Sequence, residues 1–522
     1  MVAQDKHGEP VTGLTSEDFR VFDKGTEQKI AFFSMESQGT LPADVPAPPR
    51  DTWTNRFTQG QGAPASVTLI LLDGLNTKIQ DRAYAHDQVV RFLSQIRPED
   101  RVALYALGTD LQLLHDFTQD ASSLLRTLSR YKGYNGPRLP EELGEDTEPD
   151  TGNDTLDQFL KNADAAITQN IYVQRAYRTV DALEAIAAHV EPIPGRKNLI
   201  WVSGGFPISI GYDGLPMQNP APGTDDRNFM ELVERAARAL NDANLAVYPV
   251  DAAGLMTPMS GGSRTPFFTP TNPRRPPPPS LGTPRQHIQD TMNAIADRTG
   301  GRAYYNTNDL SSAIRNALND SRVTYTLAYT PTHNEWNGKY REIKVECRRS
   351  GVRLRYRAGY FALPDTHLDA NARKQMLAEA VWSPLVATEI GLTARMSTGT
   401  LDGRAAKVIA MTVDPKDLQF EEEDGRHTTD MLMVTAQSTA GGQIVHAEEH
   451  SLAMRLKEET YQSVRQHGLR INVTLVAEPA VTRFRLVLLD AATGKLGSLD
   501  LPAAGAAAAA DRKKQPAGAA NP

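Results

Sequence analysis

The chain contains a single cysteine, Cys347, among its 522 residues. One cysteine cannot form a disulfide within the chain, a cysteine-based zinc site or an iron–sulfur cluster. Cys347 alternates with Ile343 and Val345, a pattern that predicts the buried face of a strand. No histidine stands near it in a motif of catalytic thiols, so we expect no cysteine-based catalysis.

Long apolar runs and an excess of basic residues are also lacking. No apolar stretch reaches the roughly 18–20 residues that cross a bilayer, so we expect no transmembrane span. The formal net charge is −7, whereas proteins that bind nucleic acids or anionic membranes usually carry a basic excess. We therefore expect no nucleic-acid partner.

What is present is typical of a soluble globular protein of several domains, with 40% hydrophobic and 23% charged residues. Composition and periodicity change along the chain and divide it into segments. These are a small N-terminal β unit at 1–36, a linker rich in Pro, Gly, Thr and Gln at 37–65, an α/β domain at 66–361, a C-terminal β-sandwich at 380–502 and a disordered tail at 503–522.

The central segment alternates strand and helix patterns. Val67–Leu72 is a continuous apolar run, as in a parallel strand that is buried on both faces. Further strands are predicted at 102–107, 111–114, 198–203 and 245–250, and helices at 80–96, 120–130, 171–190, 228–243, 287–298 and 309–319. This alternation predicts a mostly parallel sheet with helices on both faces. We expect 339–347 and 352–361 to extend that sheet as an antiparallel hairpin.

Two insertions interrupt this domain, an acidic one at 133–157 and a proline-rich one at 257–286. The acidic insertion could bind cations or a basic partner, although its composition favours a solvated loop. The proline-rich insertion could dock in an aromatic groove, although such a stretch is more often a stiff loop.

Polar residues follow three of the predicted parallel strands. Ligands of open α/β sheets bind beyond the carboxyl ends of the strands, so these residues are the candidate site. They are Asp73, Asn76 and Thr77 after the first strand, Ser203 after 198–203 and Asp251 after 245–250.

Several segments resemble the acidobacterial VWFA-related domain family and, more widely, von Willebrand factor type A domains. They include GEPVTGLTSEDFRVFDKG, LILLDGLNT, RVALYALGTDLQLLHDFT, GRKNLIWVSGGFP and ANLAVYPVDAAGL, in that order, and the resemblance covers roughly residues 5–361. It implies a Rossmann-like, non-enzymatic adhesion-type module that binds other proteins. It also implies a location in the cell envelope or outside the cell. MVAQDKHGEP lacks the apolar core of a signal peptide and opens partway through a strand. Either the protein is cytoplasmic, or its true start lies upstream and an export signal is missing here, as the resemblance favours.

The wider superfamily implies a metal-ion-dependent adhesion site, in which D-x-S-x-S, a Thr and a further Asp hold Mg²⁺ or another divalent cation. Asp73 and Thr77 match this pattern, but Leu75 replaces the first serine and Gly204 occupies the third-loop Asp position. We expect a degenerate, weak site in which Asn76, Ser203, Asp251 or an acidic residue of 141–157 could take part. The alternative is that Asp73 caps the following helix or anchors its loop through hydrogen bonds, without an ion.

Two other functions stay open. His446-Ala447-Glu448-Glu449-His450 matches the H-x-x-E-H pattern of some zinc proteases, which would make the chain a metal-dependent hydrolase. The flanking residues alternate as in a strand, however, and on a strand the two histidines would lie about 13 Å apart, too far to share one zinc ion. The other alternative is a metal-free structural scaffold.

Overall fold

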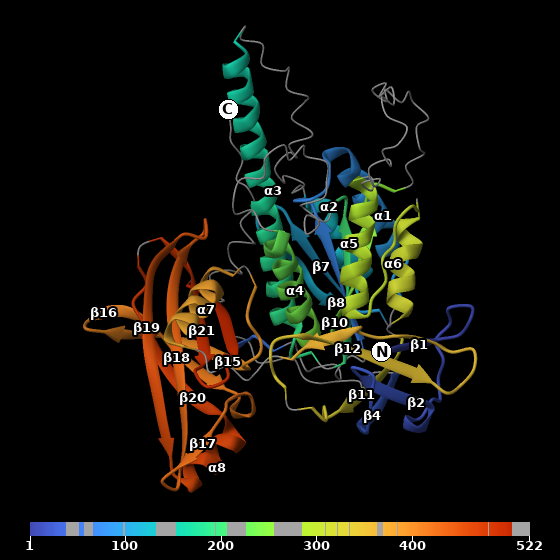
Figure 1. Cartoon of the computed structure of the whole chain (residues 1–522). Helices are drawn as coiled ribbons and strands as arrows, with labels where there is room; N and C mark the ends of the chain where they lie inside the picture. Colours follow the sequence, from blue (N-terminus) through green and yellow to red (C-terminus); the bar gives the residue numbers. More distant parts are fainter. Residues whose placement is uncertain are drawn as a thin grey trace, which may run out of the picture. The chain divides into compact units, whose positions relative to one another are not determined.

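The computed structural model describes residues 1–37, 52–56, 66–97, 100–131, 153–193, 195–205, 226–254, 284–307, 309–320, 322–333, 335–362, 369–383, 385–478 and 480–503. The chain divides into two compact units (Figure 1). The first contains 1–39, 64–184 and 195–362, and the second contains 40–63, 185–194 and 363–522.

The centre of the first unit is a five-stranded sheet with the strand order β10-β9-β6-β7-β8. Its strands are β6 (Ser66–Asp73), β7 (Val102–Leu107), β8 (Leu111–Thr118), β9 (Arg196–Ser203) and β10 (Leu245–Asp251). The pairings β10–β9, β9–β6 and β6–β7 are parallel, and in this sheet only β8 runs antiparallel, in a hairpin with β7. The prediction of a mostly parallel sheet is therefore confirmed.

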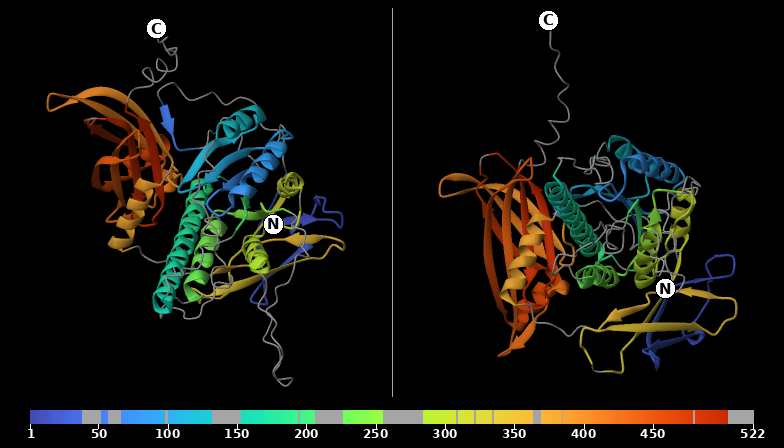
Figure 2. Two further views of the ribbon diagram at one scale, coloured as in Figure 1. Left: turned by 90° about the horizontal axis from the view of Figure 1, so that it is seen from above. Right: turned by 45° about the horizontal axis from the view of Figure 1, so that its top comes forward.

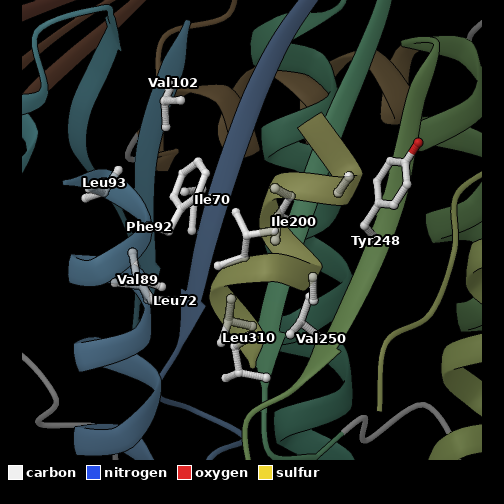
Figure 3. Packing of buried hydrophobic residues seen from close by; sticks show 14 of the residues in the cluster. Ile70, Leu72, Val89, Phe92, Leu93, Val102, Ile200, Tyr248, Val250 and Leu310 are labelled. Carbon is white, nitrogen blue, oxygen red and sulfur yellow. The ribbon is translucent and has the colours of Figure 1, made fainter. Parts of the chain in front are cut away.

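Helices lie on both faces of this sheet (Figure 2). They are α1 (Ile79–Leu93), α2 (Ala121–Arg130), α3 (Asp154–Val190), α4 (Asp226–Asp242), α5 (Pro284–Thr299) and α6 (Leu310–Asn319). Apolar residues of α1 and α6, such as Phe92 and Leu310, pack with Ile70, Ile200 and Val250 of the strands in one buried cluster (Figure 3). Since the strands are buried on both faces, their continuous apolar runs follow from this three-layer arrangement.

The N-terminal segment pairs with residues 323–361 and does not form a unit of its own. The strands concerned are β1 (Val2–Gln4), β2 (Phe19–Asp23), β3 (Thr26–Gln28), β4 (Ile30–Ser37), β11 (Val323–Tyr329), β12 (Tyr340–Cys347), β13 (Arg353–Arg355) and β14 (Gly359–Phe361). β1 pairs with β13, β2 with β3 and β12, β4 with β11, and β12 with β14, all antiparallel.

The prediction that 339–361 extends the parallel sheet is therefore wrong. The physical reason is a separate hydrophobic cluster, in which Phe19 of β2 and Tyr325 of β11 pack with Ala3, Leu14 and Val323. The apolar faces of these strands are buried against the N-terminal segment, which lies about 300 residues away in sequence.

The second unit contains two antiparallel sheets. One has the order β20-β16-β15-β5, and the other contains β17-β18-β21-β22, with β19 also paired to β18. The strands are β5 (Thr52–Thr54), β15 (Leu392–Leu401), β16 (Arg404–Val413), β17 (Glu421–Glu423), β18 (Arg426–Thr439), β19 (Ile444–Leu456), β20 (Leu469–Leu475), β21 (Val481–Asp490) and β22 (Leu496–Pro502). Buried side chains of both sheets belong to one cluster. Two helices, α7 (Ala370–Trp382) and α8 (Glu458–His467), complete the unit.

Part of the predicted linker and the H-x-x-E-H segment are strands in the structure. β5 lies inside the predicted linker 37–65, so part of that segment is a strand. The H-x-x-E-H segment lies on β19, as expected, and not on a helix. Residues 132–152, 255–283 and 504–522, which hold most of both insertions and the predicted tail, lie outside the described residues. No helix in the described part of the chain is long and apolar enough to cross a membrane.

Candidate functional site

The loop that follows β6 begins at Asp73 and is buried throughout. Asp73, Asn76 and Thr77 are each at most 2% exposed, and Leu75 is fully buried. Strand register places Ser203, at the end of β9, beside the end of β6, and Asp251 of β10 is the register partner of Ser203. The fold therefore brings these residues together at the carboxyl edge of the sheet, as the sequence predicts.

The carboxylate of Asp73 accepts four hydrogen bonds. Its Oδ1 accepts from the backbone N–H of Asn76 at 2.9 Å. Its Oδ2 accepts from Asn76 Nδ2 at 2.8 Å, from Trp201 Nε1 at 3.0 Å and from Ser203 Oγ at 2.8 Å. Burial is the largest influence on this group and raises the pKa of Asp73, while these hydrogen bonds oppose that shift.

The other loop side chains are held in the same network. Asn76 Nδ2 also donates to Thr179 Oγ1 at 2.9 Å, and Asn76 Oδ1 accepts from the Arg175 guanidinium at 3.1 Å. The Thr77 hydroxyl donates to the carbonyl of Asp73 and accepts from the backbone N–H of Gly204 at 2.8 Å. The loop is thereby tied to β9 and to α3.

Protein donors already surround most of the Asp73 carboxylate. Three of the four donors contact Oδ2, which leaves that oxygen no lone pair for a cation, and one contacts Oδ1. The oxygen of Asn76 faces a cationic guanidinium, an environment that opposes a second cation. The geometry matches the alternative in which Asp73 anchors its loop, although Asp73 does not cap α1, whose N-cap residue is Lys78.

Asp251 has a different local role. Its Oδ1 accepts from the backbone N–H of Ala253 at 2.9 Å, so the carboxylate closes its own turn after β10. Among the described residues, no three His, Cys, Asp or Glu side chains gather as a group that could hold a metal ion. The hydrolase hypothesis therefore has no metal centre of that kind in the described part of the chain.

Trp201, Arg175 and Thr179 belong to this network but match no motif in the sequence. Arg175 and Thr179 are four residues apart on α3, so they share one helix face, and that spacing is the one signal that could have paired them. Nothing local indicated that this face meets Asn76, which precedes Arg175 by 99 residues.

The N-terminal half of α3 presents a second feature, an exposed apolar face. Leu156, Phe159 and Ile167 are 44%, 66% and 60% exposed. With Leu160 and Ala163, which are partly exposed, they recur at helical spacing and form one stripe. In Figure 1, α3 extends past the neighbouring helices of its unit. Large apolar side chains gathered on an exposed helix face are typical of interaction surfaces.

No protein-family model and no curated protein sequence matches the chain. Similar solved structures include an aerotolerance-related membrane protein from Bacteroides fragilis, with 14% identity over 49% of this chain and 98% of that chain, at a TM-score of 0.27. The PilB minor pilin from Streptococcus sanguinis has 10% identity over 51% and 64% of the two chains, at a TM-score of 0.27.

A von Willebrand factor type A protein from Catenulispora acidiphila has 8% identity over 92% of this chain and 74% of that chain, at a TM-score of 0.25. All three TM-scores lie below 0.5.

Proposed function

We propose that the chain is a non-enzymatic, protein-binding module of the von Willebrand A type, related to the acidobacterial VWFA-related family, that acts in the cell envelope or outside the cell. It binds its partner without a cation at Asp73. The C-terminal unit is a β-sandwich that accompanies this module.

The observation that carries the proposal is the exposed apolar face of α3, formed by Leu156, Phe159, Leu160, Ala163 and Ile167, hereafter the α3 face. The same helix reaches the Asp73 loop through the hydrogen bonds of Arg175 and Thr179 to Asn76. The α3 face is therefore anchored at the carboxyl edge of the sheet, where ligands of open α/β folds bind. When a partner covers exposed apolar side chains, apolar surface is removed from water, and this favours binding.

The hydrogen bonds of the Asp73 loop support a metal-free mode of binding. In a metal-dependent module, a carboxylate of the partner completes the coordination of the cation, which requires a ligand oxygen that is open to solvent. Here the carboxylate is buried and its lone pairs accept protein donors. The loop then serves to hold α3 in place, and the partner contacts the helix.

The test is photo-crosslinking in cells that produce the protein. A photoreactive residue at Phe159 is expected to capture a partner protein, and Ile167→Glu is expected to abolish that capture because it places a charge in the apolar contact. Removal of divalent cations with a chelator is expected to leave the capture unchanged. Calorimetry of the purified protein with Mg²⁺, Mn²⁺ or Ca²⁺ is expected to give no heat of binding at Asp73.

The matched control is Gln158→Glu, an exposed polar position on the same helix, which should leave the capture intact. Capture that survives Ile167→Glu would contradict the role of the α3 face. Capture that requires a divalent cation and is lost in Asp73→Ala would instead support the metal-dependent adhesion site. Hydrolysis of a substrate in the presence of a divalent metal would support the hydrolase alternative.

A further inference from the structure

A second polar cluster lies in the first unit, away from the Asp73 loop. Asp23 ends β2, Tyr329 ends β11, Tyr360 belongs to β14 and His333 lies shortly after β11. These four residues come from segments separated by as many as 337 positions. Pairing of β2 and β14 with the two ends of β12 brings Asp23 and Tyr360 together.

Three side chains converge on one oxygen of the Asp23 carboxylate. Oδ2 lies 2.8 Å from the Tyr360 hydroxyl, 3.2 Å from the Tyr329 hydroxyl and 3.3 Å from His333 Nε2. His333 Nε2 in turn lies 2.9 Å from the Tyr360 hydroxyl. Four atoms that could act as metal ligands therefore form one cluster, with Asp23 Oδ2 in contact with the other three.

The other carboxylate oxygen of Asp23, Oδ1, has no such contacts within the described part of the chain. Asp23 is 2% exposed, and its Oδ1 is buried with no hydrogen-bond partner among the described residues. A buried carboxylate oxygen without a partner costs about 1–3 kcal/mol or more, and native proteins rarely leave one unmatched. The buried carboxylate of Asp73, in contrast, accepts a hydrogen bond at each of its two oxygens.

We propose that Asp23, Tyr329, His333 and Tyr360 form a binding site for one hard trivalent cation, of which ferric iron is the type. A small hard cation that lies about 2.0–2.1 Å from each ligand of an octahedron places neighbouring ligands about 2.9 Å apart. The four distances given above, 2.8–3.3 Å, lie close to that edge length and equally within the range of hydrogen bonds. The cation would satisfy both carboxylate oxygens.

The chemistry of the ligands selects the kind of cation. Carboxylate and phenolate oxygens are hard donors, and tyrosinate is an established protein ligand of ferric haem iron. With both phenols deprotonated, the site carries three negative charges, which match a trivalent cation. On binding, each phenol releases its proton to water as its oxygen coordinates, and His333 coordinates through neutral Nε2. No oxidant or reductant is needed.

Access to the site is provided from the side of His333. Its side chain is 22% exposed, whereas the side chain of Asp23 is fully buried. A cation can therefore arrive from solvent at the imidazole and the phenols and then reach the carboxylate. In the metal-free protein both phenols are hydrogen-bond donors, because burial and the nearby Asp23 carboxylate raise the pKa of each, that of Tyr360 to about 12.

The experiment uses the purified full chain, freed of metal and titrated with ferric nitrilotriacetate. Binding is expected to produce a visible charge-transfer band from phenolate to iron, to saturate at one iron per chain and to raise the melting temperature. Tyr360→Phe and Tyr329→Phe should each weaken binding at least about 100-fold, because even residues that only orient a ligand contribute 10–100-fold.

The matched control is Tyr340→Phe, which removes a phenol on β12 that packs against Phe361 and does not belong to the cluster. This variant should bind iron as the unchanged protein does. Near-ultraviolet circular dichroism establishes that each variant is folded before titration. The absence of the band in the folded, unchanged protein, or a band that persists in the double variant Tyr329→Phe with Tyr360→Phe, would overturn the proposal.

Discussion

Asp73 illustrates how a side chain that matches a metal-binding motif can take a structural role. Its carboxylate accepts from Asn76, Trp201 and Ser203, and none of these bonds requires an ion. In water the same carboxylate would be solvated, so the buried group depends on these donors. The site residues predicted at 73, 76, 77 and 203 are thus brought together, with their oxygens and nitrogens bonded to one another.

Asp73→Asn is expected to destabilise the first unit. The amide offers one acceptor oxygen, and its own NH₂ group would face Trp201 Nε1 or Asn76, both donors, so at least one buried donor loses its partner. We expect a loss of about 1–3 kcal/mol in the free energy of unfolding. Urea denaturation followed by tryptophan fluorescence measures it. The control is Asp110→Asn, at an exposed hairpin turn, and equal stability of the two variants would contradict the anchoring role.

Glu389 provides a prediction of pH dependence in the second unit. Burial, and then the hydrogen bond and charge of Glu191, raise the pKa of Glu389 to about 8 from its usual value near 4.5. The folded state therefore holds a proton that the unfolded chain releases. The stability that this proton confers is complete below about pH 4.5 and is lost as pH rises through about 8.

Glu389→Gln should remove this pH dependence, because the amide mimics the protonated carboxyl and does not titrate. Each pKa unit corresponds to about 1.4 kcal/mol, so the unchanged protein should lose at least on the order of 1 kcal/mol between pH 5 and 9 relative to the variant. Urea midpoints at a series of pH values measure the difference. Glu459→Gln, at an exposed position of α8, should retain the slope of the unchanged protein.

The contact between α5 and β10 shows how a helix and a strand are held close together. Thr299 ends α5, and its hydroxyl accepts from the backbone N–H of Val247 in β10 at 3.0 Å. Gly301 lies two residues after Thr299, and a side chain there would overlap the carbonyl oxygen of Val247. Glycine at 301 thus allows the end of the helix to approach the strand. The Thr-Gly-Gly sequence predicts where the helix ends but not this close approach.

Gly301→Ala is expected to separate α5 from β10 and to destabilise the unit by at least about 1–3 kcal/mol, as overpacking against rigid backbone does. Thermal unfolding followed by circular dichroism measures the change. Gly108→Ala is the control, because a side chain at Gly108 would meet no atom within 4 Å. A melting temperature for Gly301→Ala equal to that of the control would show that the approach is not required.

The first unit as a whole depends on pairing between its N-terminal segment and residues 323–361. Four strands within 1–37 pair with each other or with β11, β12 and β13. The shared cluster of Ala3, Leu14, Phe19, Val323 and Tyr325 would be exposed without that segment. Such exposure removes a folding contribution of about 25 cal/mol for each Å² of apolar surface.

Removal of residues 1–37 is therefore expected to give a chain that aggregates or loses fixed packing in its first unit. Near-ultraviolet circular dichroism and limited proteolysis, compared with the full chain, measure the outcome. The truncated chain would also lose ferric-iron binding, because Asp23 is removed. A soluble truncated chain with the protease resistance of the full chain would contradict the dependence.

The sequence by itself determined the local elements and their order. Continuous apolar runs such as Val67–Leu72 indicate strands that are buried on both faces, and the intervening helical periodicity then requires parallel pairing, so the edge that holds Asp73, Ser203 and Asp251 could be predicted. Those signals are local, because hydrophobic spacing reports which face of an element is buried and does not report what covers it.

Only the tertiary structure decided which distant groups meet. Arg175 and Trp201 reach the Asp73 loop, and Asp23 meets Tyr360, across separations of about 100 to more than 300 residues. Such contacts depend on how separate elements pack, and on which donors then fill the lone pairs of a buried carboxylate. For that reason the carboxylate of Asp73, which matches a motif, is surrounded by hydrogen-bond donors. Asp23 and the three residues around it match no motif and form the candidate metal site.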